Sequence, residues 1–233
     1  MIVVVGSPEG RRSEHGIEAG GTAATVARVA AAAGADVQLV GKVGEGAAGD
    51  AVLLSLAQAR VGHVAVLRDA SRETPITASA PDADAVLDPI EVTREDDGDG
   101  ASAAAVAVAE AASGSSEVAP EPSLDSGDLE LALRYLPDYR VVVVTETLGE
   151  PALATVSAAA RWAGAQLIVV VPSGTSGRGM PDDATVLESP PADPDGAFAA
   201  VIGAYAAALD RGASPAEAFA SASVGSGWSA VVD

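Results

Sequence analysis

A pair of glycines, Gly20 and Gly21, stands directly before a stretch with helical spacing and could take part in binding a polar ligand. Glycine has no side chain, so the backbone N–H groups at this point can approach a ligand closely. The N-terminal end of a helix also carries partial positive charge, which favours anions and hydroxyl groups. The pair therefore predicts a small-molecule site at the start of the helix, although adjacent glycines are also common in plain loops.

Metal binding is a second chemistry to consider, because the chain has an acidic run at 95–100 and two histidines. The run reads EDDGDG, which could form either a calcium loop or the turn of a hairpin. We favour the turn, because the sequence lacks the remaining spacing of a calcium loop and its bidentate glutamate. His15 and His63 have no neighbours at metal-ligand spacing. The sequence therefore predicts no metal site.

The elements that must position these residues are short apolar runs alternating with alanine-rich stretches. The predicted strands lie at 2–5, 37–40, 64–67, 141–145 and 167–171. The predicted helices lie at 22–33, 49–59, 125–136, 150–163 and 196–210, and a last helix starts near Pro215. This alternation predicts a mainly parallel sheet with helices on both faces. Further strands at 74–80, 85–92 and 101–109 remain open, and we expect 93–126 to be a partly flexible loop or hairpin region.

The composition favours a single cytoplasmic domain spanning residues 1–233. The chain has 233 residues, of which 48% are hydrophobic, and this is enough for one sizeable core. It contains no cysteine, which excludes disulfides and thiolate metal sites. No apolar run approaches the roughly 20 residues of a membrane span, and the start lacks the basic leader of a signal peptide. With 33 acidic residues, 13 basic residues and a net charge of -20, the chain is not expected to bind nucleic acid.

The glycine pair is the first of several motifs whose order is typical of one protein family. The helix start at 20–27 is followed by a strand and by the loop GKVGEGAAGD at 41–50. Near the C-terminus, DPDGAFA at 193–199 leads into a helix of small apolar residues. Together these motifs resemble the ribokinase family of PfkB-type carbohydrate kinases. The resemblance implies an α/β fold, a ribokinase-like three-layer α/β/α sandwich with a mainly parallel central sheet.

The resemblance also implies roles for particular residues. It implies a site for a sugar or nucleoside, with four substrate-binding residues: Gly20, Gly21, Thr25 and Glu9. It implies that Gly196 and Ala197 bind the anionic phosphoryl group. Without the resemblance, Thr25 would be interpreted as a helix-surface residue and Glu9 as a solvated acid.

The same comparison of motifs implies that the catalytic base is missing. The family motif is D-T-x-G-A-G-D, and its last aspartate takes the proton from the attacking hydroxyl group. At the matching positions this chain has Phe198 for the second glycine and Ala199 for the aspartate. Loss of a general base typically slows a reaction by about 10²–10⁴-fold. A shifted register would instead offer Asp195 or Asp193 as the base, and ATP and Mg²⁺ would then be the cofactors.

The resemblance further implies a truncated member of the family, shortened at two places. Only 13 residues separate Gly6 from Gly20, which is too few for the two-to-four-stranded lid that covers the family's sugar site. About 20 residues separate Pro172 from Asp193, where the family has its nucleotide and magnesium segment. Glu188 is the candidate there for a metal-orienting glutamate. We therefore expect a reduced or absent lid.

These observations favour a catalytically degenerate kinase homologue, a pseudokinase that keeps a small-molecule or partner-binding role. The alternative is an active ATP-dependent sugar or nucleoside kinase with a rebuilt site. A third possibility is a structural subunit, which would form a homodimer or pair with another chain through the surface that a missing lid exposes.

The chain has 33 acidic residues and a single lysine, Lys42. Many carboxylates and few lysines are typical of haloarchaeal proteins that work in molar salt. At about 1 M salt the Debye length is about 3 Å, so like charges barely repel one another. We therefore expect the melting temperature to rise as KCl is raised to molar concentration, because self-repulsion is screened. Thermal unfolding followed by circular dichroism measures this, and a melting temperature that is insensitive to KCl would contradict it.

Overall fold

The computed structural model of the chain describes residues 1–77, 123–175, 179–193 and 195–225. Its strands are β1 (Ile2–Val5), β2 (Glu9–Ser13), β3 (Gly16–Gly20), β4 (Val37–Gly44), β5 (Gly62–Asp69), β6 (Ile76–Thr77), β7 (Val141–Val144), β8 (Gln166–Pro172) and β9 (Ala184–Ser189). Its helices are α1 (Gly21–Ala32), α2 (Ala47–Gln58), α4 (Ser126–Tyr135), α5 (Glu150–Ala163), α6 (Ala197–Asp210) and α7 (Pro215–Gly225). None of these described helices is long and apolar enough to cross a membrane.

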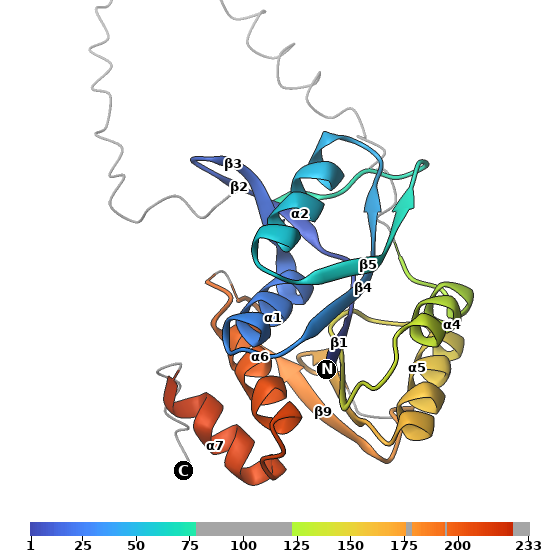
Figure 1. Cartoon of the computed structure of the whole chain (residues 1–233), viewed down its shortest axis with the longest axis vertical. Helices are drawn as coiled ribbons and strands as arrows, with labels where there is room; N and C mark the ends of the chain where they lie inside the picture. The colour runs from blue at the N-terminus through green and yellow to red at the C-terminus, as the bar shows by residue number, and fades with distance from the viewer. Residues whose placement is uncertain (78–122, 176–178, 194, 226–233) are drawn as a thin grey trace, which may run out of the picture. The chain divides into compact units, whose positions relative to one another are not determined.

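Six strands form one parallel sheet in the order β5-β4-β1-β7-β8-β9 (Figure 1). β1 lies inside this sheet and pairs with both neighbours, so that Ile2 stands opposite Val37 on one side and Val141 on the other. All four residues of β1 are 0% exposed. A strand with neighbours on both sides and helices on both faces must be apolar throughout, as this one is.

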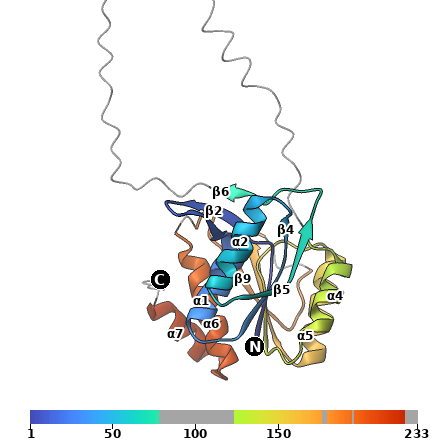
Figure 2. The same ribbon diagram turned by 45° about the horizontal axis from the view of Figure 1, so that its top comes forward.

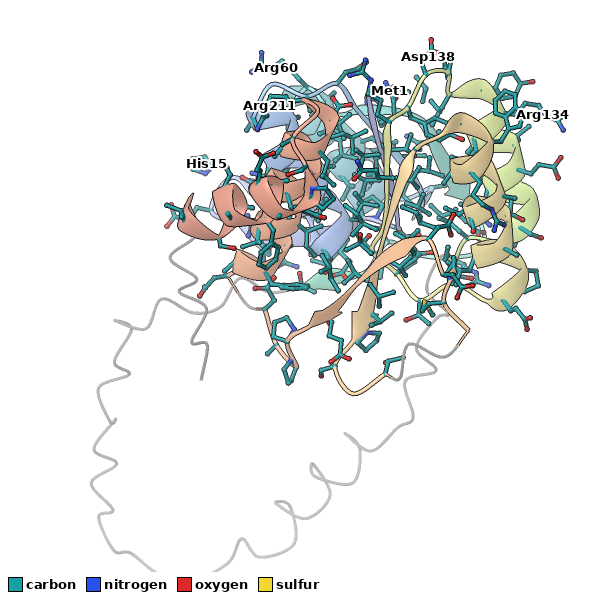
Figure 3. All side chains as sticks on the ribbon, turned by 90° about the horizontal axis from the view of Figure 1, so that it is seen from below. Met1, His15, Arg60, Arg134, Asp138 and Arg211 are labelled. Atoms are coloured by element: carbon teal, nitrogen blue, oxygen red, sulfur yellow. The ribbon has the colours of Figure 1, made fainter. Side chains whose placement is uncertain are left out.

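Alternate residues of the central strands point to opposite faces of the sheet, and each face has its own helices. On one face, Ile2 and Val4 belong to a core cluster with residues of α1, α2, α6 and α7. On the other face, Val3 and Val5 pack with residues of α4 and α5. Seen from below, α4 and α5 lie on one side of the sheet and α6 and α7 on the other (Figure 3). The predicted three-layer α/β/α sandwich is therefore confirmed.

Helices α1 and α6 pack closely because a glycine of α6 lies at their contact. A methyl group added at Gly203 would be 2.7 Å from the carbonyl oxygen of Val26 and 2.9 Å from Cβ of Val29. The contact also brings the start of α6 next to α1, since a methyl group added at Gly196 would be 3.3 Å from Cγ2 of Thr25. The position of α6 therefore depends on the absence of a side chain at Gly203.

A second, small sheet shows that the expectation of too few residues for a lid is wrong. Between Gly6 and Gly20 the chain forms an antiparallel hairpin of β2 and β3, and β6 pairs with β2 in parallel (Figure 2). The segment is long enough because each hairpin strand has five residues and just Glu14 and His15 connect them. The structure thus has a small sheet of three strands in this region, so a lid is present and not absent.

Strand β9 is not predicted by the apolar pattern of the sequence. It pairs with β8 and forms the edge of the sheet, and its residues are partly or fully exposed. An edge strand has one neighbour, so its sequence can be polar enough to resemble a loop. Of the strands left open, 74–80 contains β6, whereas 85–92, 101–109 and the acidic run at 95–100 lie outside the described residues.

The single lysine of the chain joins the sheet to α4. Nζ of Lys42 lies 2.6 Å from a carboxylate oxygen of Asp128, and the two side chains are 16% and 19% exposed. Asp128 also forms a capping box with Asp125 at the start of α4. Its backbone N–H holds the pKa of the Asp125 carboxyl group below its ordinary value. Lys42 therefore has a structural partner.

We expect Gly203→Ala to destabilise the protein by about 1–3 kcal/mol, as overpacking of a core does. At an ordinary helical position the same change would stabilise it by about 1 kcal/mol. Here the added methyl group would meet the backbone of α1, which cannot move without disturbing the core. Chemical denaturation measures the change.

The matched control is Gly127→Ala, in the first turn of α4. Its added methyl group would be 3.2 Å from a carboxylate oxygen of the exposed Asp125, so this side chain needs to shift by only a few tenths of an ångström. Equal loss of stability in both variants would show that Gly203 has no special role.

Candidate functional site

A cavity lies where the chain leaves the sheet in opposite directions. After β1 the chain continues to α1 on one face of the sheet, and after β7 it continues to α5 on the other face. Ligands of parallel sheets bind at such switch points, outside the carboxyl ends of the strands. We call this space, of about 150 Å³, the switch-point cavity. Its lining residues are Ser7, Pro8, Glu9, Thr22, Ala23, Pro75, Thr145 and Glu146.

Short contacts connect the two strand ends and fix polar groups at the cavity wall. Any side chain at Gly6 would collide with the hydroxyl group of Thr145, which donates a hydrogen bond to the carbonyl oxygen of Val5 at 3.1 Å. The backbone N–H of Ser7 donates to a carboxylate oxygen of Glu146 at 2.7 Å. The hydroxyl group of Thr145 and the carboxylate of Glu146 are therefore held in place by the backbone after β1.

Three of the predicted substrate residues lie close together, and one of them, Glu9, lines the switch-point cavity. Glu9 lines the cavity and stands opposite Gly20 across the β2–β3 hairpin. A methyl group added at Gly21 would be 3.1 Å from Cδ of the Glu9 carboxyl group. Gly21 has a φ of 77°, a conformation that glycine adopts without strain. Gly21 therefore makes room for the Glu9 carboxylate at the start of α1.

The N-terminus of α6 binds a carboxylate of the chain itself, that of Asp193. Its Oδ1 accepts a hydrogen bond from the N–H of Phe198 at 3.1 Å, and its Oδ2 accepts one from the N–H of Ala199 at 3.0 Å. Gly196 allows this turn, because it adopts the left-handed conformation with φ 67° and ψ 21°. N–H groups in the first turn of a helix have no partner within the helix. Asp193 therefore caps α6.

This cap uses the N–H groups that phosphoryl transfer would need. A transferring phosphoryl group is stabilised by donors aimed at its oxygens, and two such donors here already bind a negative charge. Ala199 is 1% exposed and carries no acid, and the neighbouring Phe198 is 9% exposed. The predicted anion-binding residues Gly196 and Ala197 do lie at this helix start, but the anion bonded there is Asp193.

Two other predicted residues, Thr25 and Asp195, line a different space, which we call the α1 cavity. It has a volume of about 460 Å³. Its lining residues are Arg11, Thr25, Arg28, Val29, Ala32, Gln58, Ala59, Arg60 and Asp195. No residue lines both cavities. The structure therefore groups Glu9 with the glycine pair, and Thr25 with Asp195 and Gly196; the roles predicted for these residues stay predictions.

The sequence pattern misses four polar residues of the switch-point cavity: Ser7, Thr22, Thr145 and Glu146. Thr145 and Glu146 directly follow β7, and Ser7 comes two residues after β1. Because ligands bind beyond the carboxyl ends of parallel strands, polar residues immediately after predicted strands were the available signal.

Metal-binding groups do not gather in the part of the chain that the structure describes. No set of three or more His, Cys, Asp or Glu side chains there is arranged to hold a metal ion. Glu188, the candidate for a metal-orienting role, lies on β9 and lines a small apolar cavity beside Phe198 and Phe219.

Comparison with known proteins agrees with the fold. Residues 3–95 match the family described as pfkB family carbohydrate kinase. This match covers less than half of the chain. A search of curated protein sequences gives no match. The resemblance predicted from the motifs is therefore confirmed at the level of the family.

Solved structures with a similar fold include three kinases. The aminoimidazole riboside kinase from Salmonella enterica is 13% identical, with a TM-score of 0.60, over 100% of this chain and 94% of that chain. The phosphofructokinase-2 from Escherichia coli in complex with fructose-6-phosphate is 16% identical, with a TM-score of 0.58, over 97% and 92%. The Arabidopsis thaliana ribokinase complexed with ribose and ATP is 16% identical, with a TM-score of 0.56, over 97% and 91%. At these identities, the likeness establishes the fold.

The family implies ATP and magnesium, and the start of α6 can be tested for its fit to them. The N–H groups of Phe198 and Ala199 are bonded to Asp193, and a phosphate oxygen at this place would meet that carboxylate. As it stands, this helix start does not fit the phosphate end of a nucleotide.

We expect Asp193→Ala to destabilise the protein by about 1 kcal/mol, the usual cost of losing a helix cap. Asp193→Asn should cost less, because the amide oxygen can still accept one of the two hydrogen bonds. Chemical denaturation at constant salt measures both. The control is Asp195→Ala, which removes the same charge two residues away from the capping contact; an equal loss in the control would argue against the cap.

Proposed function

We propose that this pfkB-family chain no longer transfers phosphoryl groups and instead binds a sugar or nucleoside in the switch-point cavity. The observation that carries the proposal is the pair of hydrogen bonds from Phe198 and Ala199 to the carboxylate of Asp193. A bound carboxylate at the N-terminus of α6 repels a phosphate and uses the donors that would stabilise it.

The absence of a base at position 199 supports the same proposal. General-base catalysis needs a carboxylate within hydrogen-bond reach of the attacking hydroxyl group. Ala199 has none, Asp193 is bonded to the start of α6, and Asp195 lines the α1 cavity. Asp195 is not among the residues that line the switch-point cavity.

The chemistry of the switch-point cavity favours a neutral ligand with several hydroxyl groups. The carboxylates of Glu9 and Glu146 accept hydrogen bonds, and the hydroxyl groups of Thr22 and Thr145 can donate or accept them. The two negative charges would repel a phosphorylated sugar. A volume of about 150 Å³ is below the roughly 300–1,000 Å³ of pockets for drug-sized ligands, so a single small ring is the better match.

We further propose that residues 1–233 act as one domain in the cytoplasm. We propose the small sheet of β2, β3 and β6 as the surface for a protein partner, including a second copy of the chain.

The proposal is tested by measuring ligand binding and ATP turnover separately. Calorimetry with ribose, fructose and adenosine in high KCl should detect binding of at least one of them without ATP. A coupled ADP assay with the same compounds, ATP and Mg²⁺ should detect no turnover. Turnover with any of them would show instead that the chain is an active kinase with a rebuilt site.

Glu146→Gln should weaken binding of that compound by about tenfold or more, because hydrogen bonds to a charged group contribute about 1.5–3 kcal/mol. The matched control is Glu130→Gln, which removes the same charge from an exposed ion pair with Arg134 on α4. Equal weakening in the two variants would show that net charge, and not the switch-point cavity, determines affinity.

A further inference from the structure

The α1 cavity gathers positive charge in a strongly acidic protein. The chain has 13 basic residues against 33 acidic ones, and three of the 13 line this cavity: Arg11, Arg28 and Arg60. They come from different elements, since Arg11 lies on β2, Arg28 on α1 and Arg60 just after α2. Asp195 is the one carboxylate among the lining residues. The fold therefore brings together charges that are far apart in the sequence.

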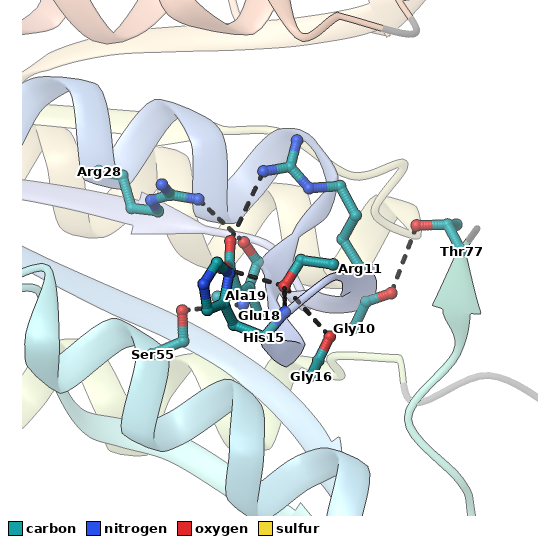
Figure 4. A network of polar contacts seen from close by, with 10 residues as sticks. Gly10, Arg11, His15, Gly16, Glu18, Ala19, Arg28, Ser55 and Thr77 are labelled. Carbon is teal, nitrogen blue, oxygen red and sulfur yellow. Dashed lines mark hydrogen bonds and ion pairs between the residues drawn. The ribbon is translucent and has the colours of Figure 1, made fainter. Parts of the chain in front are cut away.

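The charges of these arginines are weakly compensated. Among the described residues, neither Arg28 nor Arg60 forms an ion pair with a carboxylate. Arg28 donates one hydrogen bond, at 3.3 Å, to the carbonyl oxygen of Ala19. Arg11 lies 3.9 Å from Glu18, a long distance for an ion pair. Figure 4 shows Arg11 and Arg28 approaching the same part of β3, where both of these contacts are made.

The left-handed backbone conformation of Arg60 suggests that an arginine side chain is needed at this position. Arg60 has a φ of 60°, in the left-handed region, one residue after Ala59 at the end of α2. Glycine is the usual residue at this position, because any other residue is strained there by about 1 kcal/mol or more. Arg60 projects outward from the protein, as Figure 3 shows. The chain therefore has a strained arginine at the cavity where a glycine would be more stable.

From these observations we propose that the α1 cavity binds a small phosphate-bearing molecule. Guanidinium groups bind phosphate oxygens with paired hydrogen bonds, which makes arginine the preferred residue for such ligands. Thr25 and Gln58 add neutral donors, and Val29, Ala32 and Ala59 provide an apolar surface for the carbon part of the ligand. The volume of about 460 Å³ is within the range of small-molecule sites.

This site is separate from the proposed sugar or nucleoside site. The switch-point cavity is lined by the carboxylates of Glu9 and Glu146, and the α1 cavity by three guanidinium groups. The switch-point cavity therefore repels the anionic ligand that the α1 cavity attracts, and each cavity can be tested without the other.

Calorimetry of the full chain with pyrophosphate, at constant KCl, tests the proposal. Wild type should bind pyrophosphate, and Arg60→Gly and Arg28→Gln should each weaken binding by about tenfold or more. Arg60→Gly is informative because glycine relieves the left-handed strain, so this variant should unfold at the same temperature as wild type or higher. Loss of binding then cannot be attributed to loss of folding.

Two controls make the outcome decisive. Arg161→Gln removes the same charge from the exposed face of α5, outside the cavity, and should leave pyrophosphate binding unchanged. Glu146→Gln, which tests the switch-point cavity, should not weaken it either. The proposal is overturned if wild type does not bind pyrophosphate, if Arg60→Gly binds as tightly as wild type, or if Arg161→Gln weakens binding equally.

Discussion

The burial of β1 is the constraint on which the rest of this structure depends. Its four residues are 0% exposed, with β4 and β7 bonded on either side. A strand in this position requires helices on both faces, so the chain must cross the sheet on one face before β7 and on the other after it. The gap between these two connections is the switch-point cavity. The hydrogen bonds of Thr145 to Val5, and of Ser7 to Glu146, then place polar groups at the end of a wholly apolar strand.

The central part of this arrangement could be predicted from the sequence because burial leaves a clear pattern. Runs such as 2–5 and 141–145 are too apolar for anything but interior strands, and the helices at 22–33, 150–163 and 196–210 are each followed by a glycine within two residues. The β2–β3 hairpin and β9 could not be predicted in the same way. The sequence of β2, EGRRS, is polar, and the strand is held by backbone pairing with β3. β9 lies at the sheet edge and has little need of apolar residues.

The candidate site was predictable to a different extent at each of its residues. The sequence at 193–199 shows that position 199 has no acidic residue. It does not indicate that Asp193 turns back onto the N–H groups of Phe198 and Ala199, because this depends on the left-handed conformation of Gly196. The three arginines of the α1 cavity lie at positions 11, 28 and 60, and the packing of β2, α1 and α2 brings them together. No local sequence pattern predicts that these three arginines lie close together in the fold.

The carboxylate of Asp193 has a consequence for how this chain can evolve. Under the proposed function, regaining kinase chemistry needs both a free helix start and an acid at position 199. Losing Asp193 first would remove the cap and give no activity in return. Gaining an acid first would bury a second negative charge at a position that is 1% exposed, next to the one already there. Each single step is therefore disfavoured, so under the proposed function phosphoryl transfer would require both changes at the same time.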